Sequence, residues 1–141
     1  MTAKEYLGQA YRLDQRINSK LHQVESLRSL TQKVTTSYGS EPVSHTRNVS
    51  SLEDTIIRII EAEGELNSQI DKLVQLKMEI AVNIDKVRNE SYRLILEKRY
   101  LCFEQWDQIA QDMNYSRRWV LNRHERAVEV MDRILAKREG A

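Results

Sequence analysis

Side chains that could bind DNA gather near the C-terminal end of the chain, in a stretch that reads WDQIAQDMNYSRRWVLNRHERA. Arginine can donate two hydrogen bonds to the edge of guanine, asparagine can pair with adenine, and both can bind phosphate oxygens. The side chains of this stretch with such chemistry are Arg117, Arg118, Asn122, Arg123 and Arg126. The first interpretation is therefore a surface that contacts double-stranded DNA.

Two short helices joined by a tight turn would hold these side chains. Ile109, Ala110 and Met113 recur at helical spacing and predict the buried face of a first helix. Asn114 follows, and asparagine tolerates the left-handed backbone that ends many helices. Ser116 then stands at the position of an N-cap, where its hydroxyl can accept a backbone N–H of the next turn. The sequence therefore predicts a helix-turn-helix.

This stretch carries a local surplus of positive charge. The 141 residues carry a formal net charge of only +1, with 22 Lys and Arg against 21 Asp and Glu. Between Ser116 and Ala127, however, four Arg stand against one Glu. A protein that coats DNA without selecting a sequence is usually far more basic overall. A small basic patch on a nearly neutral chain favours docking at one discrete site.

The composition favours a soluble, helical protein inside the cell. Aromatic residues make up 6% of the chain and charged residues 30%, with one Pro and four Gly, a mixture typical of solvated helices. The sequence contains no apolar run of membrane-spanning length and no apolar segment of signal-peptide type. We therefore expect no contact with a membrane.

Patterns of catalytic or metal-binding residues are missing from the sequence. His22, His45 and His124 are scattered, without partners at the spacing of metal ligands. Cys102 is the single cysteine, which excludes an intrachain disulfide and a cysteine-based zinc site. A glycine-rich phosphate loop is also missing. We expect a protein that is not an enzyme and that holds no cofactor or metal.

The N-terminal part of the chain predicts one long helix and a linker. Residues 1–36 carry apolar side chains, from Tyr6 to Val34, that recur at three- and four-residue steps. Residues 37–50 include Gly39 and Pro42 with several hydroxyl residues, and we expect them to form a linker.

A second long helix is expected over residues 51–91. Ser50, followed three residues later by Glu53, forms a capping-box pattern ahead of an apolar run. The heptad pattern continues toward Lys98, so this helix could run directly into a C-terminal domain, residues 92–141. The predicted fold class is all-α: a long antiparallel helical hairpin or coiled coil, followed by a small helix-turn-helix domain.

Apolar residues of the second helix recur every seven residues, which is typical of a coiled coil. Glu63 and Lys77 interrupt the pattern. Because the first helix is shorter than the second, part of the apolar stripe should remain for another subunit, and we expect a homodimer or a higher homo-oligomer. The alternative is a monomer in which the stripe packs on the C-terminal helices. The residues predicted to form the subunit interface are Ile59, Leu66, Ile70, Leu73, Ile80, Ile84 and Val87.

The C-terminal segment resembles the fourth conserved region of sigma-70-type factors. The resemblance lies in four segments: the lead-in RLILEKRYL, the segment DQIA, which is similar to the family's EIA triplet, the run SRRWV and the closing HERA. Together with the helical N-terminal part, it is similar to phage-encoded regulators of Gram-positive bacteria, the ArpU- and RinA-like late-gene activators and related phage-associated families of unknown function.

The resemblance implies a role for each position of the motif. In that fold the second helix of the motif enters the major groove of DNA. The positions that face the groove are then Arg117, Arg118, Leu121, Asn122 and Glu125, and those placed at phosphates are Tyr115, Ser116 and Arg126. Arg123 stands where relatives often have an apolar residue, so a DNA contact and a packing role both stay open. His124 lies near the inner face, where it would form a structural hydrogen bond.

The function that the resemblance implies is sequence-specific regulation of transcription of phage or prophage genes, in the cytoplasm of a bacterial host cell. RNA polymerase is a further candidate partner. One alternative is a small terminase subunit for DNA packaging, and another is a coiled-coil adaptor that binds RNA polymerase. Small terminases usually carry the DNA-binding domain before the oligomerising hairpin, so the order found here favours a regulator.

Overall fold

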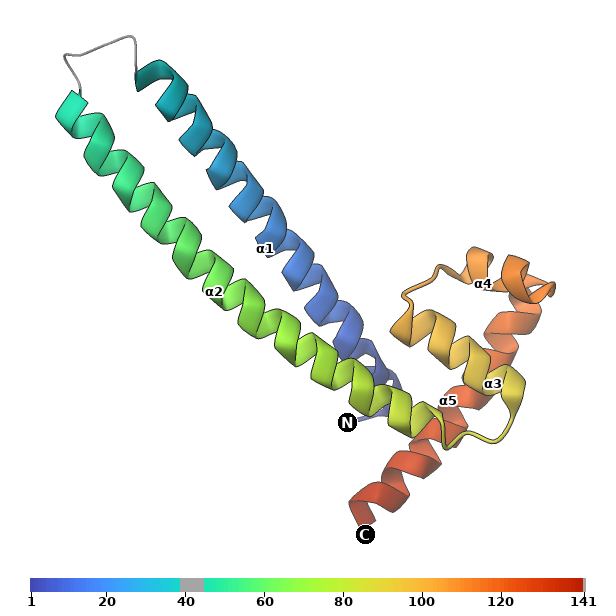
Figure 1. Ribbon diagram of the computed structural model, residues 1–141. Helices are drawn as coiled ribbons and strands as arrows, with labels where there is room; N and C mark the ends of the chain where they lie inside the picture. The colour runs from blue at the N-terminus through green and yellow to red at the C-terminus, as the bar shows by residue number, and fades with distance from the viewer. Residues whose placement is uncertain (39–44, 141) are drawn as a thin grey trace. The chain divides into compact units, whose positions relative to one another are not determined.

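The computed structural model describes residues 1–38 and 45–140, and every regular element in them is helical. The prediction of an all-α fold is confirmed. The elements are α1 (Ala3–Tyr38), α2 (His45–Ile84), α3 (Glu90–Leu96), the π-helix η2 (Glu97–Leu101), α4 (Trp106–Met113) and α5 (Arg117–Gly140) (Figure 1). The chain divides into two compact units: unit 1 contains residues 1–13 and 73–141, and unit 2 contains residues 14–72.

Unit 2 is an antiparallel hairpin made by the distal parts of α1 and α2 (Figure 1). Ile17 and Val24 of α1 and Ile59 and Leu66 of α2 are buried. Two ion pairs join the helices: Lys20 Nζ lies 2.9 Å from Glu65 Oε2, and Arg28 pairs with Glu63. Glu63, which interrupts the heptad pattern in the sequence, therefore has a cation beside it within the hairpin.

The boundaries of the two long helices differ from those predicted. The first helix ends at Tyr38 and the second begins at His45, five residues before the capping-box serine Ser50. The prediction of a helix start at Ser50 is therefore wrong. No Gly or Pro follows Pro42 in this segment, so nothing in the backbone chemistry prevents the helix from starting earlier. The rest of the predicted linker, residues 39–44, lies outside the described residues.

The heptad pattern suggested that the second helix could run directly into the C-terminal domain, but the structure shows a break between them. The second helix ends at Ile84, and α3 begins at Glu90 after a separate cap. The side chain of Asn89 accepts a hydrogen bond from the backbone N–H of Tyr92 at 3.1 Å and so starts the new helix. Val87 lies in the loop that connects the two helices. It is nevertheless buried, because its side chain packs in the core of unit 1.

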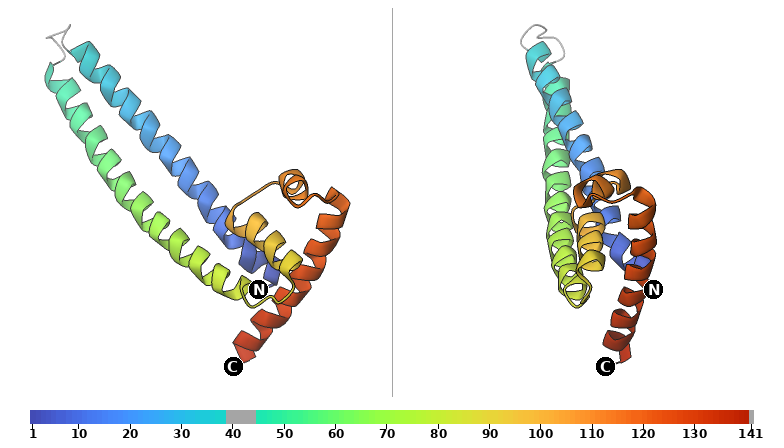
Figure 2. Two further views of the ribbon diagram at one scale, coloured as in Figure 1. Left: turned by 45° about the vertical axis from the view of Figure 1, so that its right-hand side comes forward. Right: turned by 90° about the vertical axis from the view of Figure 1, so that its right-hand side faces the viewer.

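Unit 1 is built around the first turns of α1, which lie beside the last turns of α2 (Figure 2). The backbone N–H of Ala3 donates to Asp132 Oδ1 of α5 at 2.9 Å, and Asn83 Nδ2 donates to the buried Tyr6 hydroxyl at 2.7 Å. The buried residues of this core are Ala3, Tyr6, Leu7, Ala10, Ile80, Ile84, Val87, Leu96, Ala127, Val128 and Met131. The N-terminus of the chain is thus part of the C-terminal domain.

This packing corrects the predicted subunit interface. Five of its seven residues are buried within the chain: Ile59 and Leu66 in unit 2, and Ile80, Ile84 and Val87 in the core of unit 1. Leu73 packs against the core of unit 1 and is half-buried. Of the predicted set only Ile70 is exposed. The heptad stripe is therefore covered mainly by elements of the same chain and is not free to bind another subunit.

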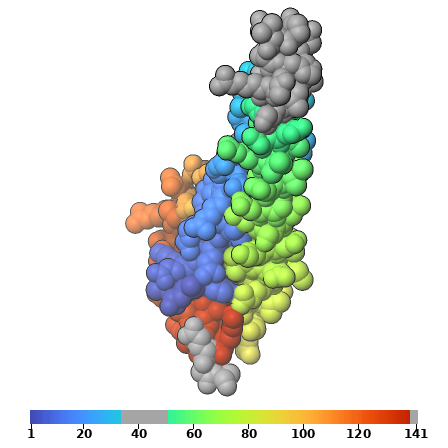
Figure 3. All heavy atoms as spheres, turned by 90° about the vertical axis from the view of Figure 1, so that its left-hand side faces the viewer, coloured from blue at the N-terminus to red at the C-terminus, as the bar shows by residue number. Residues whose placement is uncertain are grey.

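Other apolar side chains of α2 are exposed instead. They are Ile56, Ile57 and Ile60 in unit 2, and Val74, Met78 and Val82 in unit 1. Figure 3 shows the exposed surface of α2 as the green band. Across the described parts of the chain, no helix combines the length and apolarity needed to cross a bilayer.

Candidate nucleic-acid interface

A small core within unit 1 holds α4 and α5 together. Ile95 of α3, Ile109 and Ala110 of α4, and Val120 of α5 are buried against one another. The half-buried residues that pack around them are Trp106, Met113 and Trp119. Ile109, Ala110 and Met113 therefore form the inner face of α4, as their spacing predicted.

The turn between α4 and α5 has the geometry that the sequence predicted. Asn114 adopts the left-handed conformation, with φ 59° and ψ 38°, and its backbone N–H bonds to carbonyls of the last turn of α4. Ser116 caps α5, because its Oγ accepts the backbone N–H of Trp119 at 3.1 Å. Both local predictions are confirmed. The left-handed residue that ends α4 and the cap that starts α5 together fix the direction in which α5 leaves the turn.

The first turns of α5 present a row of polar side chains to solvent. Arg118, Asn122 and Arg126 follow one another at four-residue steps, so they lie on one side of the helix, and all three are exposed. Within the part of the chain that the structure describes, these side chains make no hydrogen bond or ion pair with protein. Three donor groups of a rigid helix are thus free to bind a ligand.

Two other positions of the predicted groove-facing set have partners or are partly covered. Arg117 is exposed, and its Nε lies 3.6 Å from Asp107 Oδ1 of α4. Both groups are exposed to solvent, so the pair contributes little to stability and leaves Arg117 able to exchange its partner. Leu121 is half-buried.

Glu125 is exposed but paired with the N-terminus of the chain. Lys4 Nζ lies 3.1 Å from Glu125 Oε1, and this hydrogen bond is the largest cause of a lowered pKa for the Glu125 carboxyl. The start of α1 therefore lies beside the third turn of α5. Lys4 is a residue that sequence reasoning missed, because no local pattern links positions 121 residues apart.

Arg123 packs against aromatic rings. Its guanidinium carbon lies 4.9 Å from the ring centre of Trp119 and 5.6 Å from that of Tyr92. Trp119 in turn stacks on Tyr115, with ring centres 3.6 Å apart. This stack favours the packing role for Arg123, one of the two alternatives that the sequence left open. Tyr115 remains exposed.

His124 forms the structural hydrogen bond that its inward position predicted. Its side chain is buried, and Nε2 lies 2.6 Å from the Tyr100 hydroxyl of η2. Burial is the main reason that the pKa of His124 falls to about 4 and that of Tyr100 rises to about 12. The imidazole is therefore neutral at pH 7, and in the tautomer with its proton on Nδ1 it accepts from the hydroxyl.

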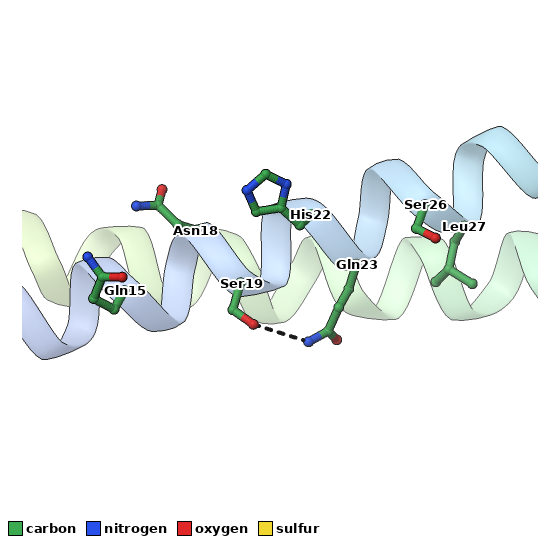
Figure 4. Close-up of a pocket in the computed structure, with 7 residues that line it drawn as sticks. All are labelled: Gln15, Asn18, Ser19, His22, Gln23, Ser26 and Leu27. Carbon is green, nitrogen blue, oxygen red and sulfur yellow. Dashed lines mark hydrogen bonds between the residues drawn. The ribbon is translucent and has the colours of Figure 1, made fainter.

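Two further features of the described residues bear on metal binding and on catalysis. In residues 1–38 and 45–140, no group of three or more His, Cys, Asp or Glu side chains could hold a metal ion. A large hollow on unit 2 is lined only by residues of α1 (Figure 4). Its side chains, among them Asn18 and His22, stand along a single helix and do not converge on one point. This hollow lacks the convergent groups of a catalytic site.

A family model described as "Protein of unknown function (DUF1492)" matches residues 40–132 of the chain. The match covers about two thirds of the sequence, and the chain belongs to this family. It includes α3, α4, the turn and most of α5, and it excludes the first turns of α1 that complete unit 1. No curated protein and no solved structure matches the chain significantly.

Proposed function

We propose that this protein is a sequence-specific DNA-binding regulator of transcription, and that α4 and α5 form its helix-turn-helix. The observation that carries the proposal is the free row Arg118, Asn122 and Arg126 on the capped first turns of α5. Arginine and asparagine are the side chains that most specifically read guanine and adenine in the major groove. The resemblance to the fourth region of sigma-70-type factors supports the same use of α5 and suggests phage or prophage promoters as targets.

A binding selection on randomised duplexes, followed by fluorescence anisotropy, tests this proposal. Arg118→Ala and Asn122→Ala should each lose about 1–3 kcal/mol on the selected duplex and much less on random duplex. The matched control is Arg58→Ala, which removes one exposed arginine from α2 in unit 2. Equal affinity of all three variants for the selected duplex would refute the assigned reading face.

We further propose that two subunits pair through the exposed apolar residues of α2. Val74, Met78 and Val82 are spaced by four residues and lie on one side of the helix, with 52%, 65% and 60% of their surfaces exposed. In an antiparallel pair with Met78 at the twofold axis, Val74 would meet Val82 of the second copy. A twofold dimer would place two reading helices on two half-sites.

A further inference from the structure

A cavity of about 860 Å³ lies in unit 1, and the residues that line it do not include Arg118, Asn122 or Arg126. Its walls are the loop that follows α2, Tyr92 of α3, and the C-terminal half of α5. The volume lies within the usual range of sites for small molecules, which is about 300–1,000 Å³. Neither the proposed DNA contact nor the proposed dimer uses this cavity.

The charge of the cavity is strongly one-sided. Among the described residues that line it, five are basic and none is acidic: Lys86, Arg88, Arg133, Lys137 and Arg138. The whole chain carries a formal charge of only +1, so this is a local concentration of positive charge. Like charges that surround one space repel each other, and a bound anion removes this repulsion.

Three of the five basic groups are free. Arg138 pairs with Glu79 at 2.7 Å, and Lys86 Nζ donates to Asn83 Oδ1 at 3.2 Å. Arg88, Arg133 and Lys137 make no hydrogen bond or ion pair within the described part of the chain. Several phosphate groups could therefore be bound without breaking a contact of the protein.

The floor of the cavity is apolar and held in place. Val87 is fully buried, and its carbonyl accepts a hydrogen bond from Arg93 Nη1 at 3.0 Å. Tyr92, Val130 and Ile134 are half-buried beside it. Such a floor offers contact to a flat apolar group and nothing to a bare phosphate ion.

We propose that this cavity binds a nucleoside polyphosphate, with its phosphates on Arg88, Arg133 and Lys137 and its base against the half-buried side chains of Tyr92, Val130 and Ile134. The cavity volume of about 860 Å³ suits a ligand of nucleotide size and is far more than a single phosphate needs. A free triphosphate would satisfy the cations but not the apolar floor.

Isothermal titration calorimetry of the full chain tests the proposal, with ATP, GTP and inorganic tripolyphosphate as probes. At least one nucleotide should bind ten or more times more tightly than tripolyphosphate. The double variant Arg88→Gln with Arg133→Gln should weaken that nucleotide at least tenfold, whereas Arg58→Gln should not. Equal binding of nucleotide and tripolyphosphate, or no nucleotide binding at millimolar concentration, would overturn the proposal.

The same double variant separates this proposal from the proposed function. Circular dichroism establishes that the variant is folded, and its affinity for the selected duplex is then measured without nucleotide. Unchanged DNA affinity with lost nucleotide binding supports a separate nucleotide site. If the wild-type chain binds no nucleotide and the double variant has reduced affinity for the duplex, the cavity belongs to the DNA interface and the nucleotide proposal alone is overturned.

Discussion

The buried pair of His124 and Tyr100 predicts that the protein loses stability in mild acid. The pKa of His124 falls from 6.5 to about 4 in the folded protein, chiefly because burial disfavours the imidazolium. Lys4 and Arg99 lower this pKa further, whereas Glu125, whose Oε1 lies 3.7 Å from Nδ1, raises it. The folded protein therefore resists protonation at a pH at which the unfolded chain accepts a proton.

The sign and size of the effect follow from this difference in pKa. Between pH 6.5 and 4 the unfolded state binds more protons than the folded state, so the free energy of unfolding decreases as the pH falls. The contribution of His124 is fully present above pH 6.5 and is lost as the pH falls toward 4. From pH 7.5 to pH 4.5 the expected loss is about 2.5 kcal/mol.

Urea unfolding followed by circular dichroism measures this loss at several pH values between 7.5 and 4.5. The matched control is His124→Gln, which can still accept a hydrogen bond from the Tyr100 hydroxyl but does not titrate in this range. Acidic residues titrate in both proteins, so the difference between their slopes isolates His124. Identical slopes, or an NMR titration of His124 with a midpoint near 6.5, would refute the reasoning.

Three further predictions concern the same unit. Because the pKa of Tyr100 is raised to about 12, unfolding should become easier as the pH rises above 10, and Tyr100→Phe should lessen this alkaline loss in a urea titration. Ser116→Ala should cost about 1 kcal/mol of unfolding free energy by removing the cap of α5, whereas Ser116→Asp should preserve it. Met78→Glu should lower the mass measured by light scattering to that of a monomer. Lys72→Glu, at an exposed position of α2 outside the set Val74, Met78 and Val82, should not lower it. A Met78→Glu protein that keeps the mass of the wild type would exclude the proposed pairing.

The local features of the candidate site could be predicted from the sequence because neighbouring residues determine them. The left-handed turn at Asn114 and the cap at Ser116 depend on backbone conformation and on a hydrogen bond within three residues. The inward position of His124 follows from the helical periodicity of α5. Such features can be predicted because the interactions that determine them join residues close together in the sequence.

The assignment of the apolar stripe on α2 failed for a different reason. Periodicity shows that Ile80 and Ile84 need to be buried, but it does not show which partner buries them. In the structure they pack within unit 1 with Leu7 of α1 and Met131 of α5. The end of α2 was missed because Val87 continues the heptad pattern, although it lies in the loop before the cap at Asn89.

The start of α1 contacts α5, the helix that holds both the proposed DNA-binding residues and His124. Ala3 and Lys4 contact Asp132 and Glu125 on α5, across separations of 129 and 121 residues that no sequence pattern connects. Lys4 also contributes to the lowered pKa of His124. The first turns of α1 therefore act on α5 in two ways: they pair with the carboxylate next to the free row, and they help to keep the imidazole behind that row neutral. It follows that a change at the N-terminus would alter the electrostatics of α5 without touching the proposed reading residues.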